Sequence, residues 1–445
     1  MKYTPHTNTD IKDMLECIGV KSIDDLFNVI PDDVRLKNLP EFEGFDEYKL
    51  LNHIEKIADK NKLNTKDWTI FLGAGRYYHF IPEVVNFITA RSEFSTCYTP
   101  YQPEVSQGTL QAIYEYQTLI CKIFGMEVAN ASMYDGASAL AEAILMSIRI
   151  TGKNKIALPT AINPLYRKVV TTYLKPLETE IIYLPYSNDG VTYYNSIRNI
   201  KDLAAIVIQS PNFFGCIESL EELSQICKSQ KCLSIVSFTE ALAYGLINPP
   251  GLYDIDIVCG EAQSFGLPPS YGGPSLGIFT TKMQYVRSMP GRLVGQSVDK
   301  DGKRGFVLTL ATREQHIRRE KATSNICTNE NLCAIVACIY LTYLGKNGLF
   351  SISKLIYDKK EYLKNSLKDI GINTYFNAPT FNEFVIKAPP DFLEIYKQLT
   401  NKNILAGLPL KGYYPELNNT YLLTVTEILS KQQIDRFVDE VKNAL

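Results

Sequence analysis

The sequence of 445 residues predicts an α/β fold, with a mainly parallel sheet in a large domain and a small α+β domain after it. Between about residue 66 and residue 320, short apolar runs alternate with amphipathic helical stretches. The runs have no polar face, which is typical of strands buried on both sides of a covered parallel sheet. Two further strand patterns and a capped final helix indicate the small domain.

Six apolar runs are the strand candidates of the large domain: KIALP (155–159), IIYLP (181–185), AAIVIQ (204–209), LSIVSF (233–238), DIVCG (256–260) and SLGIFT (275–280). Helical patterns lie before and between them, such as VSQGTLQAIYEYQTLICKIFG, NPLYRKVVTTYLK and SLEELSQICKSQK. The small domain has the strand candidates FNEFVIKA and YLLTVTE, which follow a helix, NLCAIVACIYLTYLG. Ser430 and Gln433 form a capping box for the last helix.

The chain is expected to have three parts: a helical arm (1–65), the large domain (66–328) and the small domain (329–445). In the arm, apolar residues recur at helical spacing from Ile11 to Ile18, and Gly19 ends that helix. A second short helix is expected from Ser22. The arm could pack on a partner chain or on its own domain.

Composition narrows the class of protein. The net charge of −2 gives no general attraction to nucleic acid or to an anionic membrane. The polar N-terminus has no signal-peptide core, and no apolar run approaches the length of a membrane span. The ten cysteines form no C-x-x-C pair and the four histidines are well separated, so we expect reduced thiols and no metal site. These features predict a cytosolic protein.

A large doubly wound domain followed by a small α+β domain is the plan of the largest class of pyridoxal-phosphate (PLP) enzymes, fold type I. A possible phosphate cradle fits that plan. Asp135, Gly136, Ala137 and Ser138 stand directly before a helical pattern, and free amides at a helix N-terminus bind phosphate. The alternative is that Asp135 only caps the helix while Gly136 eases the turn.

The residue that holds the cofactor is missing. In PLP enzymes of this class the Schiff-base lysine ends the strand before a glycine-rich segment, here residues 266–277. That place carries Gln263, and no lysine or arginine occurs between Lys231 and Lys282. An acid usually follows the preceding strand and pairs with the pyridine nitrogen; Glu240 is nearby, without a clear claim to the role.

Several motifs together resemble one family, the glycine cleavage system P-protein, and within it the first subunit of the two-subunit glycine dehydrogenase (decarboxylating). The motifs are FLGAG (71–75), CYTPYQPE (97–104), MYDGAS (133–138), QSPNFFG (209–215), YGGP (271–274) and TREQHIRREKATSNICT (312–328). The resemblance runs from the arm to the end of the chain, and the last motif is the most specific.

The resemblance implies that a second, homologous subunit carries the lysine and binds PLP covalently, so that this chain alone is inactive. It implies that the pair, with two copies of each subunit (α2β2), decarboxylates glycine and passes the aminomethyl group to the lipoyl arm of the H-protein. Gln263 is then what the family predicts at the lysine position.

This chain would lend residues to the partner's PLP site. One candidate loop holds Tyr98, Thr99, Tyr101 and Gln102, whose rings can stack on a flat cofactor; the alternative is a rigid turn that packs the interface. Thr323, Ser324 and Asn325 follow a basic run (318–321) and could reach a phosphate oxygen; alternatively that run is a solvated helix face. Cys327 is expected to be a structural thiol.

Two other functions stay open. The chain could be a non-catalytic scaffold that stabilises its homologous partner. It could also be a self-sufficient PLP enzyme that uses Lys282, although that lysine follows the strand after the glycine-rich segment.

Overall fold

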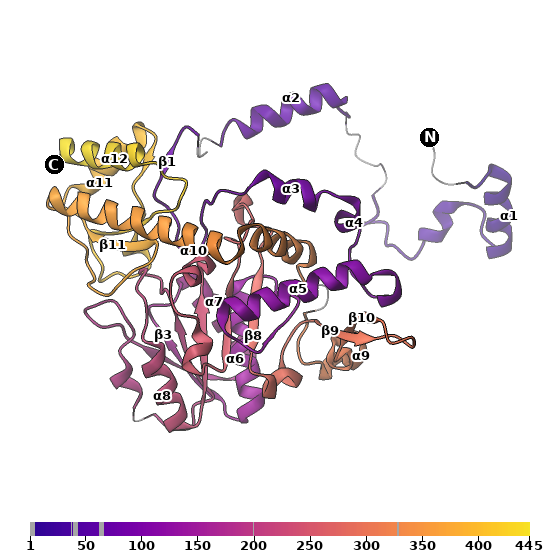
Figure 1. The fold of residues 1–445 in the computed structure, drawn as a ribbon. Coiled ribbons are helices and arrows are strands. Elements are labelled where there is room, and N and C mark those ends of the chain that lie inside the picture. Colours follow the sequence, from indigo (N-terminus) through magenta and orange to yellow (C-terminus); the bar gives the residue numbers. More distant parts are fainter. Residues whose placement is uncertain (1–4, 37, 39–42, 62–65, 199, 327–328) are drawn as a thin grey trace. The chain divides into compact units, whose positions relative to one another are not determined.

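A computed structural model describes residues 5–36, 38, 43–61, 66–198, 200–326 and 329–445. Contacts divide the chain into two units, Met1–Leu63 and Asn64–Leu445. The first unit holds α1 (Asn8–Ile18), a 3-10 helix (Ile23–Phe27) and α2 (Glu47–Ala58) (Figure 1). The helix expected up to Ile18 is present, and Gly19 ends it with a φ of 84°. The patterns above did not predict α2.

The second unit is built around a seven-stranded sheet in the order β2-β8-β7-β6-β5-β3-β4 (Figure 1). Strands β3 to β7 are mutually parallel, and β8 runs antiparallel to β7 and to β2. The strand bounds are β2 (Val128–Ala129), β3 (Lys155–Pro159), β4 (Glu180–Leu184), β5 (Ala205–Gln209), β6 (Leu233–Phe238), β7 (Ile257–Glu261) and β8 (Gly277–Thr281). The six predicted strands and the mainly parallel α/β class are confirmed.

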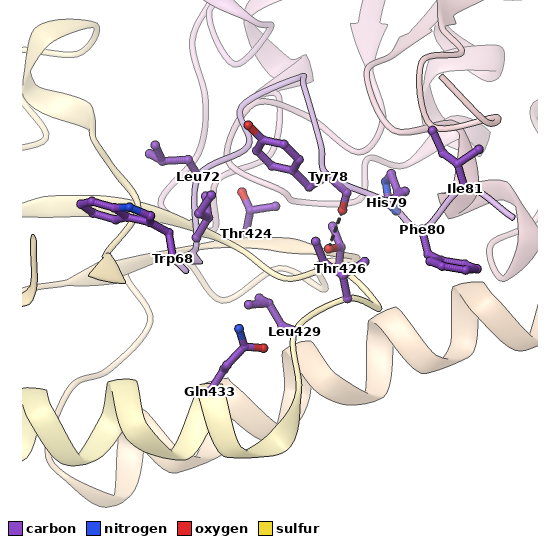
Figure 2. Close-up of a pocket in the computed structure, with 12 residues that line it drawn as sticks. Trp68, Leu72, Tyr78, His79, Phe80, Ile81, Thr424, Thr426, Leu429 and Gln433 are labelled. Atoms are coloured by element: carbon purple, nitrogen blue, oxygen red, sulfur yellow. Dashed lines mark hydrogen bonds between the residues drawn. The ribbon is translucent and has the colours of Figure 1, made fainter. Parts of the chain in front are cut away.

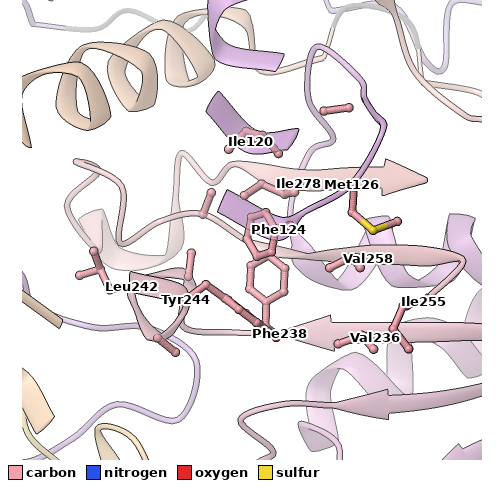
Figure 3. Packing of buried hydrophobic residues seen from close by; sticks show 14 of the residues in the cluster. Ile120, Phe124, Met126, Val236, Phe238, Leu242, Tyr244, Ile255, Val258 and Ile278 are labelled. Atoms are coloured by element: carbon pink, nitrogen blue, oxygen red, sulfur yellow. The ribbon is translucent and has the colours of Figure 1, made fainter. Parts of the chain in front are cut away.

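Helices cover both faces of this sheet because alternate residues of each buried strand point to opposite sides. In β5, Ala205 and Val207 pack toward α6 (Gly136–Thr151) and α7 (Pro164–Leu174). Ile206 and Ile208 pack toward the other layer, which holds α5 (Gln107–Phe124), α8 (Leu220–Gln230) and α10 (Asn331–Asp369). In that layer the rings of Phe124 and Phe238 stack 4.7 Å apart, with Tyr244 edge-on to both (Figure 3).

The C-terminal part has its own antiparallel sheet in the order β11-β14-β13, and its own apolar cluster. Its elements are β11 (Glu383–Lys387), α11 (Phe392–Asn401), β12 (Ile404–Leu405), β13 (Leu408–Pro409), β14 (Thr420–Thr424) and α12 (Lys431–Ala444). The capping box of Ser430 and Gln433 is present at α12. Strand β1 (Thr69–Ile70) pairs with β12, and Phe71 joins this cluster, so residues 69–71 pack with the C-terminal part.

Four further elements lie outside the predicted pattern: α3 (Glu83–Thr89), α4 (Ser92–Ser95), the hairpin of β9 (Leu293–Val298) and β10 (Arg304–Thr309), and α9 (Gln315–Arg318). Among the described residues, α10 alone is long and apolar enough to cross a membrane by length and composition. Its first half packs on the core through Ala334, Ile335 and Tyr340, as expected of a core helix, and Gly345 interrupts it with a φ of 59°.

Candidate functional site

The carboxyl ends of β6 and β7 meet the start of α6, which is where open α/β sheets of this kind bind ligands. Thr239 and Glu240 follow β6, Gln263 lies just beyond β7, and Gly136 begins α6. These residues are all buried. The three features singled out in the sequence, the helix start, the lysine position and the acid after β6, therefore lie around one place.

The start of α6 is already filled. Asp135 caps the helix by accepting a hydrogen bond from Ser138 N at 2.7 Å. Gly136 N donates to Glu261 Oε2 at 3.1 Å. A Cβ atom on Gly136 would overlap Tyr166 Oη and would lie 2.7 Å from Glu261 N. The amide of Gly136, which a phosphate would need, is thus bonded to an internal carboxylate, and Tyr166 packs beside the same residue.

Gln263 is hydrogen-bonded to the backbone of Tyr77, which lies just after the FLGAG segment (71–75). Its Oε1 accepts a hydrogen bond from Tyr77 N at 3.0 Å, and its Nε2 donates to Tyr77 O at 3.0 Å and to Leu267 O. Both functional groups of the amide are used in this clamp. An amide cannot form a Schiff base, so Gln263 holds the 73–80 segment in the pocket in place of a cofactor.

Lys282 lies at the other edge of the sheet. Its Nζ donates to Asp256 Oδ1 at 2.8 Å, and Asp256 precedes the first residue of β7. The length of β7, about 17 Å at 3.3 Å per residue, separates that end from the end near Gln263. This placement disfavours a self-sufficient enzyme that uses Lys282.

The 73–80 segment joins the pocket to the C-terminal sheet through buried polar groups. Tyr77 Oη donates to Glu383 Oε2 at 2.8 Å and lies 3.2 Å from Thr239 Oγ1. Glu383 also accepts from Ala74 N at 2.7 Å and from Thr424 Oγ1 at 2.7 Å. Burial raises the pKa of Glu383 to about 7, although these donors oppose the shift.

His79 lies between two buried carboxylates. Its Nε2 is 3.0 Å from Glu240 Oε2, and its Nδ1 is 2.8 Å from Glu427 Oε2. Burial alone would lower the pKa of His79, but the two carboxylates outweigh burial and raise it to about 10. The acid after β6 is therefore occupied by a charged histidine of this chain, and is not open to a pyridine nitrogen.

A cavity of about 270 Å³ lies beside this network, between residues 68–81 and the β14–α12 region (Figure 2). Thr426 Oγ1 donates to Tyr78 O at 2.7 Å across one wall. The lining is Trp68, Ile70, Leu72, Tyr78, His79, Phe80, Ile81, Thr424, Thr426, Ile428, Leu429 and Gln433. It offers no lysine and does not include the start of α6.

Taken together, the residues present do not fit PLP. The amide at the lysine position is clamped, the first amide of α6 is taken by Glu261, and the acid after β6 is paired with His79. PLP chemistry needs a primary amine and an open phosphate site. This pocket has neither.

The second group of candidate residues lies on the surface. Tyr98 and Tyr101 are 79% and 55% exposed. The Arg292 guanidinium lies 4.7 Å from the centre of the Tyr101 ring, and Arg292 Nε is 3.7 Å from Glu314 Oε2. Arg292 therefore connects the tyrosine loop to the 312–326 motif, an arrangement that the sequence reasoning missed because nothing local marks Arg292.

The remaining candidate residues lie either in the tyrosine loop or in the 312–326 motif. Thr99 and Ser324 are half-buried, and Ser324 Oγ accepts from Ile326 N at 3.2 Å. Thr323 is also half-buried, and its N donates to Arg313 O at 3.1 Å. Gln102 and Asn325 are exposed. Cys327 lies outside the described residues.

The basic run does not form one regular helix face. Helix α9 ends at Arg318, and Arg319, with a φ of 51°, begins a separate 3-10 turn that extends to Lys321. These residues are exposed. Their charges therefore lie around a turn next to Thr323.

Comparison with known proteins gives a consistent result. The model of the glycine cleavage system P-protein family matches residues 1–441. A probable glycine dehydrogenase (decarboxylating) subunit 1 of Desulfotalea psychrophila is 49% identical over 444 residues, 99% of this chain and 98% of that protein. The corresponding protein of Thermotoga maritima is 45% identical over 441 residues, 99% of each chain.

Solved structures agree. A glycine decarboxylase (P-protein) of the glycine cleavage system, in inhibitor-bound form, superposes with a TM-score of 0.90 and 37% identity over 100% of both chains. A sphingosine-1-phosphate lyase of Burkholderia pseudomallei has a TM-score of 0.66 at 13% identity, covering 93% of this chain and 94% of that one, and supports the fold type I class alone. With the fold and the family resemblance both confirmed, the chain belongs to the glycine cleavage system P-protein family.

Proposed function

We propose that this chain is the first subunit of a two-subunit glycine dehydrogenase (decarboxylating), and that it completes a PLP site whose lysine lies on the second subunit. The observation that carries the proposal is that Gln263, Gly136 N and Glu240 are all bonded to groups of this chain, whose relatives are named as one subunit of that enzyme. PLP, when bound by the partner, supplies the electron sink for decarboxylation. The residues of this chain bind and orient the ligands at that shared site and exclude water from it.

The complex would pass the aminomethyl group from glycine to the lipoyl arm of an H-protein, with two copies of each subunit. We place it in the cytosol, in keeping with the reduced state of the cysteines: Cys17, Cys97, Cys121, Cys216, Cys227, Cys232, Cys259, Cys333 and Cys338 are all free thiols.

A mixing experiment tests the division of labour. The purified chain alone should release no CO2 from carboxyl-labelled glycine and should retain no PLP after gel filtration. Decarboxylation should appear when the second subunit and lipoylated H-protein are added, and should saturate at equal amounts of the two subunits. Retention of PLP and glycine decarboxylation by the chain alone would contradict the proposal.

The exposed tyrosine loop is the part of this chain that best fits a role at the shared site. Tyr101 projects an exposed ring whose position is set by the Arg292 guanidinium beneath it. A ring held in this way loses little freedom when it packs against a flat ligand. Tyr98, Thr99 and Gln102 extend the same surface, and Thr323, Ser324 and Asn325 adjoin it through Arg292 and Glu314.

Replacing Tyr101 by alanine should lower kcat of the mixed enzyme about tenfold, equivalent to about 1.4 kcal/mol of activation free energy. Tyr101→Phe keeps the ring over Arg292 and separates stacking from the hydroxyl. Tyr193, which is 46% exposed and precedes a distant 3-10 helix (Tyr194–Ile197), provides the control Tyr193→Ala. If Tyr101→Ala turns over normally in a complex shown intact by sizing, this loop has no catalytic role and the chain acts there as a scaffold only.

A further inference from the structure

The carboxylate of Glu261 lies against the first amide of α6. It is the last residue of β7 and is 3% exposed. Its Oε2 accepts a hydrogen bond from Gly136 N at 3.1 Å, and its Oε1 accepts from Leu276 N at 3.2 Å. A buried anion that accepts backbone N–H groups at a helix N-terminus makes the contacts that a bound phosphate makes.

A positive charge accompanies this carboxylate. Burial raises the pKa of Glu261 to about 7, and the charge of Arg76 opposes that rise. Arg76 is held in place by bonds from Nη2 to Ser275 Oγ and, at 3.4 Å, to Gly272 O. An arginine beside a helix N-terminus is a common partner for a phosphate group, and here its charge acts on an internal acid.

Strand β7 and Tyr166 pack closely against the first residue of α6. A Cβ atom on Gly136 would overlap Tyr166 Oη and would meet Glu261 N at 2.7 Å and the Gly260 carbonyl carbon at 2.9 Å. An anion that bound the amide of Gly136 would have to displace the carboxylate of Glu261, which accepts that hydrogen bond in the folded chain. The glycine at this helix start is needed for the approach of β7.

We propose that Glu261 is an internal substitute for the phosphate group of a cofactor, and that it keeps this chain's own pocket closed to phosphate. The inference rests on the proposed function, which makes α6 the counterpart of a cofactor-binding helix. It goes further by assigning the closure to one side chain, and it predicts that removal of that carboxylate opens a site for inorganic phosphate or a phosphate monoester.

The test uses the purified full chain and inorganic phosphate as the probe, with chloride at matched ionic strength as the reference. Wild-type chain should show no phosphate-dependent change in Tm. Glu261→Ala should melt at least about 4 °C lower, because two buried N–H donors lose their acceptor. Millimolar phosphate should restore at least half of that loss, with a saturable dependence.

Glu218 supplies the matched control. Its carboxylate is 5% exposed and accepts from Thr192 N and Asn212 Nδ2, but it does not face the start of α6. Glu218→Ala should also lower Tm, and phosphate should not restore it. If Glu261→Ala does not fold, Glu261→Ser keeps a small hydroxyl acceptor without the charge, leaves most of the carboxylate's space free, and is compared in the same way.

Two results would overturn the inference: saturable stabilisation of the wild-type chain by phosphate, or no greater recovery of the Glu261 variants than of Glu218→Ala. Saturable stabilisation of the wild-type chain by phosphate would contradict the inference by itself, even if neither Glu261 variant folds. The phosphate test uses this chain alone, so its outcome does not depend on the mixing experiment. Failure of the mixing experiment would contradict the subunit assignment without affecting the test of Glu261.

Discussion

Replacing His79 by glutamine is expected to lower the free energy of unfolding by about 3–5 kcal/mol, the range for removing one partner of a buried ion pair. His79 is buried between Glu240 and Glu427, with ring nitrogens 3.0 and 2.8 Å from their carboxylate oxygens. A neutral amide can donate a hydrogen bond but cannot balance either charge. Chemical denaturation near neutral pH measures the loss.

The effect of His79 should depend on pH. Its pKa is raised from 6.5 to about 10 in the folded chain. A group with a raised folded pKa contributes its full stabilisation below the unfolded pKa and loses it as pH rises through the folded pKa. The difference in stability between wild type and His79→Gln should therefore be constant below about pH 6.5 and shrink toward pH 10.

An exposed ion pair serves as the control. Lys431 Nζ lies 2.7 Å from Asp435 Oδ2, and both side chains are substantially exposed. Lys431→Gln should leave the free energy of unfolding almost unchanged, because solvent screens an exposed ion pair. A His79 variant that resembles this control, or a difference that does not change between pH 6.5 and 10, would show that His79 is not charged in the folded chain.

Gly215→Ala should be comparably damaging, at about 3–5 kcal/mol when a left-handed backbone and a steric clash are combined. Gly215 ends the QSPNFFG motif with a φ of 82°. A Cβ atom there would overlap the main-chain oxygen of Glu383 and lie 2.5 Å from its carbonyl carbon. Neither backbone can yield easily, because Glu383 also holds Tyr77 and Ala74 through its side chain.

Gly302 separates the two contributions. It has a similar φ of 77°, but no atom lies within 4 Å of its expected Cβ position among the described residues. Gly302→Ala should therefore cost only the conformational part, about 1–2 kcal/mol. Equal losses of unfolding free energy for the two variants, measured by denaturant titration, would mean that contact with Glu383 does not explain the glycine at position 215.

The fold was predictable where a local pattern determines it. The strands of the sheet, such as Ala205–Gln209, are apolar on both faces, and that pattern is legible in five or six residues. The β9–β10 hairpin was missed because polar residues and glycines interrupt the apolar residues of its strands, although Asp301 and Gly302 are typical turn residues. Strand β1 was missed because its partner, β12, lies more than 300 residues away.

The candidate site was predictable to the same extent: its local features were visible in the sequence, and its long-range contacts were not. The absence of a lysine at Gln263 was evident from the sequence alone, since it concerns one position next to a recognisable strand. What replaces the cofactor was not. Glu261 and Gly136 lie 125 residues apart, and His79 and Glu427 lie 348 apart. The sequence did contain one signal. Glu261 ends the apolar strand IVCGE, and a buried carboxylate there needs hydrogen-bond partners.

The contact of Glu261 with Gly136 also determines how the stability of this subunit depends on ligands. A protein stabilised by a dissociable ligand gains stability with the logarithm of the free ligand concentration. An acid built into the chain is present at a fixed effective concentration. On the proposed division of labour, the stability of this subunit would therefore not depend on the concentration of PLP, whereas the stability of the partner that binds PLP would depend on it.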